Sequence, residues 1–295
     1  MSIRISINFV KELKSESEME KFLSEFKAFV GSTELFDTDF CGEDSNETFD
    51  FGDGPVEAKR HMNPDGSEGG WVAATTHVDS TCYIGVDALV YGNARVFENA
   101  RVLDTAQVFG NAWVFGDARV SGEAQVSGDA QVFGDALVSG DARVYENAQV
   151  YGNAWVLDTA RVYGRARVYE NALVTTNAQV SGNAQVFGDV RVSGDAQVYG
   201  EAQVTDNARV SGDAWVFGTA QVFGNAWVYG NALVTTNAQV SGNAQVFGDA
   251  LVSGNARIFG DARVYDSTQV FGNARVFGNA LVFGDARVSG DERKC

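Results

Sequence analysis

Residues 90–113 read VYGNARVFENARVLDTAQVFGNAW, four consecutive units of six residues. Their common form is V-[FYS]-[GED]-[ND]-A-[RQWL]. The pattern continues in register from Ile84 to Arg293, which makes 35 units without an insertion or deletion, and two looser units from Val72 to Tyr83 precede it. A short period repeated this often is the signature of a solenoid.

Each unit combines a short strand with a corner. The run Ala-x-Val-x alternates buried and exposed residue types, as a strand with one buried face does. Gly followed by Asn or Asp tolerates the positive φ of a tight turn. Strands this short bury a core only when coils stack. Three units per 18-residue coil predict a triangular prism, and roughly 12 coils at about 4.8 Å make a rod of about 55–60 Å.

The units resemble the hexapeptide repeat of the left-handed parallel β-helix, the trimeric LpxA-like superfamily. Its aliphatic position matches Val90, Val96 and Val102, and its small position matches Ala94, Ala100 and Ala106. The run Gly69-Gly70-Trp71-Val72 before GNA-x-V units is also similar to a group of bacterial and phage proteins labelled as transferases. The resemblance implies an all-β fold, a single-stranded left-handed parallel β-helix of about 12 triangular coils. Left-handedness comes from the resemblance alone, because parallel crossovers are normally right-handed.

Three regions follow: a head over residues 1–70, a rod over residues 71–293 and a tail over residues 294–295. Residues 2–10 alternate like a strand, and residues 11–30 carry apolar side chains at the spacing of an amphipathic helix. The sequence therefore predicts a small α+β cap over the first coil. A head that binds a partner is a second interpretation, compatible with the first.

The net charge of −17 opposes direct binding to nucleic acid or to an anionic membrane. Residues 1–83 carry a net charge of −10, so the head is more acidic per residue than the rod. We therefore expect the head to contact a protein, for example one with a basic nucleic-acid-binding surface. The candidate contact residues are Glu43, Asp44, Glu47, Asp50 and Asp53.

Residues 84–293 contain no His, Lys or Cys. The resemblance implies a catalytic His and coenzyme A in the acyltransferases, and three zinc-binding His in the carbonic anhydrases. This chain has only His61, expected at the surface, and His77, expected at an outward position. We therefore name no catalytic residue, no metal ligand and no cofactor, and a non-enzymatic role is favoured over an enzymatic one.

Carboxylates recur at the corners, where Asp104, Glu123, Asp141 and Asp158 are spaced to stack in a column. Corner geometry and solubility explain them best. Cation binding, or imitation of a nucleic-acid backbone, is the functional alternative.

The face through Val96 and Val114 carries an aromatic residue after nine of its eleven core aliphatic residues, and Leu137, Trp155, Leu173, Trp227 and Leu281 are expected in a neighbouring column. The rings either stack within the sheet or form an interface, because a monomer rarely exposes so long an apolar strip. The candidate oligomer interface comprises Phe97, Phe115, Phe133, Tyr151, Tyr169, Phe187, Phe259, Phe271, Phe277 and Phe283.

The favoured hypothesis is a non-enzymatic, cytoplasmic scaffold that forms a dimer or trimer and presents its acidic head to a partner protein. One version is a phage-type inhibitor that imitates nucleic acid toward a host defence protein. The alternatives are an acyltransferase relative, active or lapsed, and a polymer-forming structural protein. No membrane-spanning segment or signal peptide is recognised in the sequence.

Overall fold

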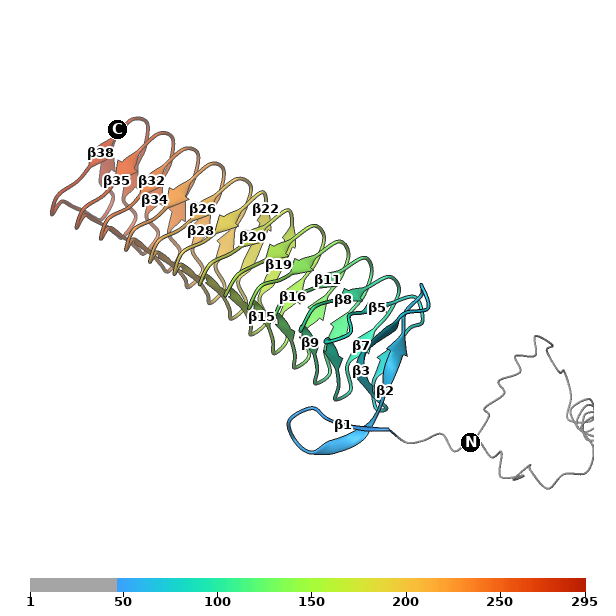
Figure 1. The fold of residues 1–295 in the computed structure, drawn as a ribbon. Helices are drawn as coiled ribbons and strands as arrows, with labels where there is room; N and C mark the ends of the chain where they lie inside the picture. Colours follow the sequence, from blue (N-terminus) through green and yellow to red (C-terminus); the bar gives the residue numbers. More distant parts are fainter. Residues whose placement is uncertain (1–46) are drawn as a thin grey trace, which may run out of the picture. The chain divides into compact units, whose positions relative to one another are not determined.

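The computed structural model describes residues 47–295, which form forty strands and no α-helix (Figure 1). The helix expected over residues 11–30 lies outside the described residues. Within the described part, no helix has the length and apolar character needed to cross a membrane.

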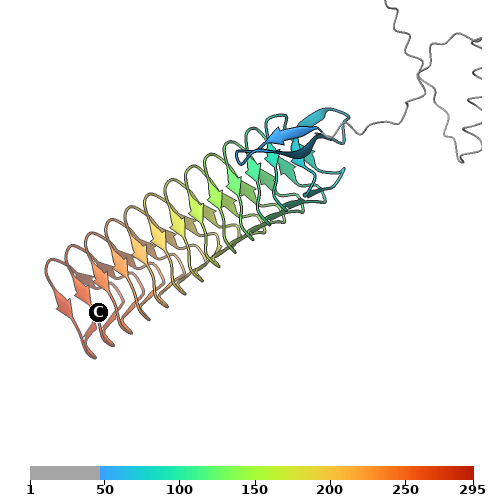
Figure 2. The ribbon, with the colours of Figure 1, turned by 90° about the horizontal axis from the view of Figure 1, so that it is seen from below.

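The strands form three long sheets, one on each side of a stack of triangular coils (Figures 1 and 2). The first sheet runs in the order β1 (Thr48–Asp50), β2 (Pro55–Met62), β3 (Glu68–Ala73), β6 (Leu89–Val90), β9 (Gln107–Val108), β12 (Gln125–Val126), β15 (Arg143–Val144), β18 (Arg161–Val162), β21 (Gln179–Val180), β24 (Gln197–Val198), β27 (Trp215–Val216), β30 (Leu233–Val234), β33 (Leu251–Val252), β36 (Gln269–Val270) and β39 (Arg287–Val288).

The second sheet contains β4 (His77–Val78), β7 (Arg95–Val96), β10 (Trp113–Val114), β13 (Gln131–Val132), β16 (Gln149–Val150), β19 (Arg167–Glu170), β22 (Gln185–Gly188), β25 (Gln203–Val204), β28 (Gln221–Val222), β31 (Gln239–Val240), β34 (Arg257–Ile258), β37 (Arg275–Val276) and β40 (Arg293–Lys294). The third contains β5 (Tyr83–Ile84), β8 (Arg101–Val102), β11 (Arg119–Val120), β14 (Leu137–Val138), β17 (Trp155–Val156), β20 (Leu173–Val174), β23 (Arg191–Val192), β26 (Arg209–Val210), β29 (Trp227–Val228), β32 (Gln245–Val246), β35 (Arg263–Val264) and β38 (Leu281–Val282).

Successive strands of each sheet are parallel and one coil apart. Val114 pairs with Val132, for example, and Trp113 pairs with Gln131, so each residue lies beside the residue 18 positions later. This register confirms the predicted 18-residue coil, and the chain forms an all-β parallel β-solenoid of about 12 coils. The left-handed sense of the helix stays a prediction.

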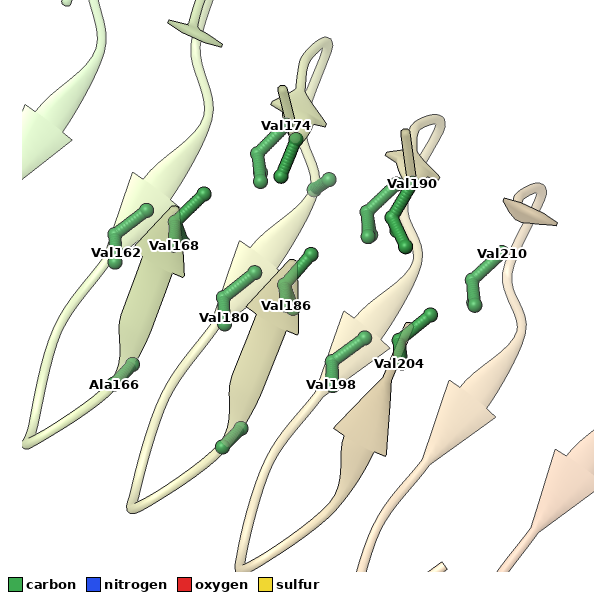
Figure 3. Packing of buried hydrophobic residues seen from close by; sticks show 14 of the residues in the cluster. Val162, Ala166, Val168, Val174, Val180, Val186, Val190, Val198, Val204 and Val210 are labelled. Carbon is green, nitrogen blue, oxygen red and sulfur yellow. The ribbon is translucent and has the colours of Figure 1, made fainter. Parts of the chain in front are cut away.

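The interior is filled by the repeated Val and Ala side chains, nearly all of which are fully buried. In Figure 3, rows of valine from the three sides point toward a common axis. Val190 occupies an alanine position of the repeat and is also fully buried. Burial of one valine side chain contributes about 1.5–3 kcal/mol, so the core stabilises every coil.

Corners use the left-handed backbone that the Gly-Asn and Gly-Asp pairs predict. Gly110 has a φ of 69°, and a Cβ there would lie 3.0 Å from the Gly128 nitrogen of the next coil. Among residues 47–295, nine residues other than glycine take the same conformation. Asp104 and Thr236 are two of them, and each accepts a hydrogen bond from the backbone N–H of the residue 18 positions later. These side chains thereby tie one coil to the next.

The rod's first sheet extends into the region that the sequence assigned to the head. β1 pairs with β2, and β2 pairs with β3, both antiparallel, and β3 then pairs in parallel with β6. Residues 47–295 accordingly form one structural unit. Gly70 permits the close approach, since a Cβ there would lie 2.0 Å from the Ala88 carbonyl oxygen.

Candidate interaction surfaces

The first coil is closed by side chains from β2 and the turn that follows it. The Ile84 N–H donates to Asn63 Oδ1 at 2.8 Å, and Asn63 Nδ2 donates to the Ile84 carbonyl at 3.2 Å. The His61 Nε2 lies 3.1 Å from the Cys82 carbonyl oxygen, so it carries the proton and donates it. His61 is buried, which corrects the expected surface position, and burial lowers its pKa. This histidine therefore has a structural partner.

An uninterrupted stack of six rings runs along the second sheet. Adjacent centroids lie 4.7–4.9 Å apart with planes within 7° of parallel. The stack contains Phe97, Phe115, Phe133, Tyr151, Tyr169 and Phe187. Each ring is only half-buried. Neighbouring rings cover both faces of the four inner rings and one face of each end ring, and solvent reaches the edges. We call these six rings the aromatic ladder.

The other predicted interface rings lie apart from this ladder. Phe259 and Phe277 form a separate pair on the second sheet. Phe271 follows β36 on the first sheet, and Phe283 ends a stack on the third. The structure therefore brings six of the ten candidates together. Five apolar residues expected beside the ladder lie on the third sheet instead, namely Leu137, Trp155, Leu173, Trp227 and Leu281.

Amide and carboxylate side chains form hydrogen-bonded columns at the corners. Asn111 donates to Asp129 at 3.0 Å, and Asn171 donates to Asp189 at 2.9 Å, each across one coil. Asp104 and Asp158 instead accept backbone N–H bonds, at 2.9 and 3.1 Å. For Asp158, hydrogen bonds from Thr175 and from the backbone of Thr176 lower the pKa. These partners support the structural explanation of the corner acids.

Charges of opposite sign are separated on the rod. Within residues 84–293 every arginine except Arg165, which lies in a corner, occupies a flat face, and most carboxylates occupy the corners. The ion pairs found within residues 47–295 join Arg60 to Glu68, His77 to Asp79 and Lys294 to Glu292, so none involves an arginine of residues 84–293. Several arginines instead lie over rings, as Arg95 does over Trp113 at 5.2 Å. The rod thus presents basic flats beside acidic edges.

The head acids fall into three groups. Glu43 and Asp44 lie outside the described residues. Asp50 accepts the backbone N–H groups of Gly52 and Gly54 at 2.8 and 2.9 Å, so it shapes the turn between β1 and β2. Glu47 and Asp53 are exposed and make no such contact in the described region, which leaves them available to a partner.

The titratable groups with catalytic potential are few. His77 is exposed, as expected, and its Nε2 lies 3.0 Å from Asp79 Oδ1. Cys82 is buried, and burial, the largest cause, raises its pKa to about 11, so the thiol is poorly nucleophilic. Among residues 47–295, no group of three metal-ligating side chains comes together.

The repeats of the rod match a known family of repeat proteins. The model described as the YdcK beta solenoid repeat matches residues 106–122, 130–146, 160–176, 166–182, 184–200, 202–218, 226–242, 238–254, 256–272 and 268–282. The rod is therefore built from repeats similar to this β-solenoid family. A search of curated proteins found no match.

Solved structures resemble the chain weakly. An Arabidopsis UDP-N-acetylglucosamine acyltransferase is 11% identical, with 72% of this chain and 71% of that chain covered and a TM-score of 0.27. A Desulfovibrio desulfuricans G20 protein, provisionally described as an acetyltransferase, is 9% identical over 73% of this chain and 68% of that chain, with a TM-score of 0.24. Likeness at this level carries no functional conclusion.

Proposed function

We propose that this protein is a non-enzymatic scaffold, a rod that associates with further copies of itself through the second sheet and holds an acidic N-terminal region toward a partner protein. The observation that carries the proposal is the uniform face of the second sheet. There the aromatic ladder spans six coils without an inserted loop or a register shift. A flat face of constant pitch suits contact with another rod better than it suits a small ligand.

A second copy is the occupant that the charges favour. Arg95 and Arg167 lie on the face of the second sheet, beside the ladder, and have no carboxylate within 4.0 Å among the described residues. The corner column of the same protein supplies carboxylates such as Asp117 and Asp135, one coil apart. Since both columns have the same pitch, two copies aligned in parallel can place Arg95 and Arg167, four coils apart, each beside a corner acid of the other copy.

The association is tested by adding charge to the face while every ring stays in place. Gln131 and Gln149 are paired neighbours on the second sheet, and Gln179 and Gln197 are their equivalents on the first. Light scattering after gel filtration should give an oligomeric mass for the wild type and a monomer for Gln131→Lys with Gln149→Lys. The control, Gln179→Lys with Gln197→Lys, should remain oligomeric. A monomeric wild type would overturn this part of the proposal.

The second part of the proposal is that the acidic N-terminal region binds a partner protein. Its support is the net charge of −10 over residues 1–83 and the exposure of Glu47 and Asp53. The expected partner is a protein with a basic nucleic-acid-binding surface, and a phage-type inhibitor of a host defence protein is the specific form we propose. A cytoplasmic location would follow from that role.

Capture from a bacterial lysate tests this second part of the proposal in the full chain. One bait neutralises Glu43, Asp44, Glu47 and Asp53 with the corresponding amides and keeps Asp50, because Asp50 closes a turn. The control bait neutralises four acids of a different corner column, Asp195, Asp213, Asp249 and Asp285, to asparagine, the other common corner residue. A DNA- or RNA-acting protein retained by wild type and control, and lost from the first variant, is the expected result. Equal retention by all three baits contradicts it.

Acyl transfer is the second candidate function. The observation in its favour is the exposed His77 held by Asp79, a pairing able to orient a general base. A transferase should bind coenzyme A and lose acetyl transfer on His77→Ala. Without coenzyme A binding by the intact oligomer, this candidate fails.

A further inference from the structure

An interruption in the rings of the first sheet creates a hollow. Tyr91 stacks on Phe109, and Tyr145 stacks on Tyr163, each with centroids 4.9–5.0 Å apart. Between these pairs the column position is occupied by Ser127. Because serine is much smaller than a ring, a hollow of about 210 Å³ remains, lined by Gln125, Ser127, Arg143, Tyr145 and Arg161.

Every lining side chain can donate a hydrogen bond, and none is a carboxylate. Arg143 and Arg161 are register partners on β15 and β18, so their chains run about 4.8 Å apart. Neither arginine has a carboxylate within 4.0 Å in the described part of the chain. The nearest acids along the chain are corner residues that do not line the hollow: Asp141 precedes Arg143 by two residues, Asp158 precedes Arg161 by three, and Glu146 follows Tyr145. Like charges directly opposite across two strands destabilise a sheet unless something lies between them.

We infer that this hollow binds a tetrahedral oxyanion, a phosphate group that is either free or carried as a monoester by a small molecule. The paired guanidinium groups supply charge-assisted hydrogen bonds, and the hydroxyls of Ser127 and Tyr145 supply further donors. A second depression, lined by another pair of arginines on neighbouring strands, differs from this hollow in net charge. Arg101 and Arg119 line a depression that also contains Asp65 and Asp117, so its lining has no net charge.

Two independent variants test the site by calorimetry at low salt, with inorganic phosphate and phenyl phosphate as probes. Arg143→Gln with Arg161→Gln removes the charge and should weaken binding at least tenfold. The matched control, Arg257→Gln with Arg275→Gln, removes an equivalent register pair on the second sheet and should change affinity less than twofold. Equal weakening by both pairs would overturn the site, since it would report only the overall charge.

Ser127→Phe closes the hollow without altering any charge. The new ring should stack between Phe109 and Tyr145 as Phe115 does between Phe97 and Phe133. Binding should fall at least tenfold while the melting temperature holds or rises. Unchanged affinity in this variant, or no binding of either probe to the wild type at about ten millimolar, would overturn the inference. Tighter binding of phenyl phosphate identifies a monoester as the ligand, and equal binding identifies the free anion.

Discussion

The Asn63 side chain takes the place of a neighbouring strand beside Ile84. Its Oδ1 accepts the Ile84 N–H at 2.8 Å and its Nδ2 donates to the Ile84 carbonyl at 3.2 Å. In later coils the backbone of the corresponding residue pairs with the strand of the preceding coil, as the backbone of Val102 pairs with β5. One primary amide thereby satisfies an edge that would otherwise leave a buried donor and acceptor unpaired.

Asn63→Ala should open the first coil. Two buried backbone groups lose their partners, which costs about 1–3 kcal/mol each. Alkylation of Cys82, a buried thiol in that coil, measures the opening, since its pKa of about 11 and its burial protect it in the closed state. We expect faster labelling of Cys82 in the variant. Asn99→Ala, which removes only an exposed amide bond to Asp117, should leave that rate unchanged; equal acceleration by both variants would contradict the closing role of Asn63.

His61 should make stability dependent on pH. Burial, the main cause, and the positive charge of Lys59 lower its pKa below 6.5, so the unfolded chain binds the proton more readily than the folded chain. Stability therefore rises with pH between the folded and unfolded pKa values and falls as pH drops below about 6.5. His61→Gln offers an amide donor to the same carbonyl and should flatten the profile between pH 7 and 5. Urea denaturation across this range, compared with His77→Gln as the exposed control, measures the difference. Parallel profiles for wild type and His61→Gln would contradict the assignment.

Gly70→Ala should be among the most damaging single substitutions. The added carbon would lie 2.0 Å from the Ala88 carbonyl oxygen and 2.5 Å from that of Gly85, both backbone atoms that cannot move independently. We expect a loss of about 3 kcal/mol in the free energy of unfolding. Gly284→Asn is the control, because nothing lies within 4 Å of a Cβ there and asparagine tolerates positive φ. Limited proteolysis near β3 reports the expected opening, and a variant as resistant as wild type would refute it.

The repeat made the rod predictable because each unit encodes its own strand, corner and buried face. Even the duplicated segment NALVTTNAQVSGNAQVFGD behaves as its spacing requires. Its copies at 171–189 and 231–249 are 60 residues apart, or three coils and one unit, and they place β20 on the third sheet and β30 on the first. The sheet to which a residue belongs follows from its spacing along the chain, and the five apolar residues expected beside the ladder show this. Leu137 lies 24 residues after Trp113, one coil and one unit, and therefore lies on the third sheet.

The closure of the first coil could not be predicted in the same way. Asn63 reaches Ile84 because the turn after β2 reverses the chain, and no periodic pattern covers residues 47–70. The run Asn63-Pro64-Asp65-Gly66 is a recognisable turn signal, and it was the available hint of a hairpin. The phosphate hollow was equally hidden, since it depends on Ser127 lacking a ring within one column rather than on any motif.

The aromatic ladder should stabilise the rod in addition to its proposed role in self-association. Phe115 stacks on rings at 4.8 Å on both sides, whereas Phe223, in the same column of the same sheet, has Thr205 and Ser241 as its neighbours. Because each stacked pair contributes about 0.5–1.5 kcal/mol beyond buried area, Phe115→Ala should cost about 1–3 kcal/mol more than Phe223→Ala. Urea denaturation of both variants, at a protein concentration where neither associates, isolates the stacking contribution. Equal losses would contradict a stabilising role for ring stacking. The lysine variants at Gln131 and Gln149 would then be the only test of the proposed function of the second sheet.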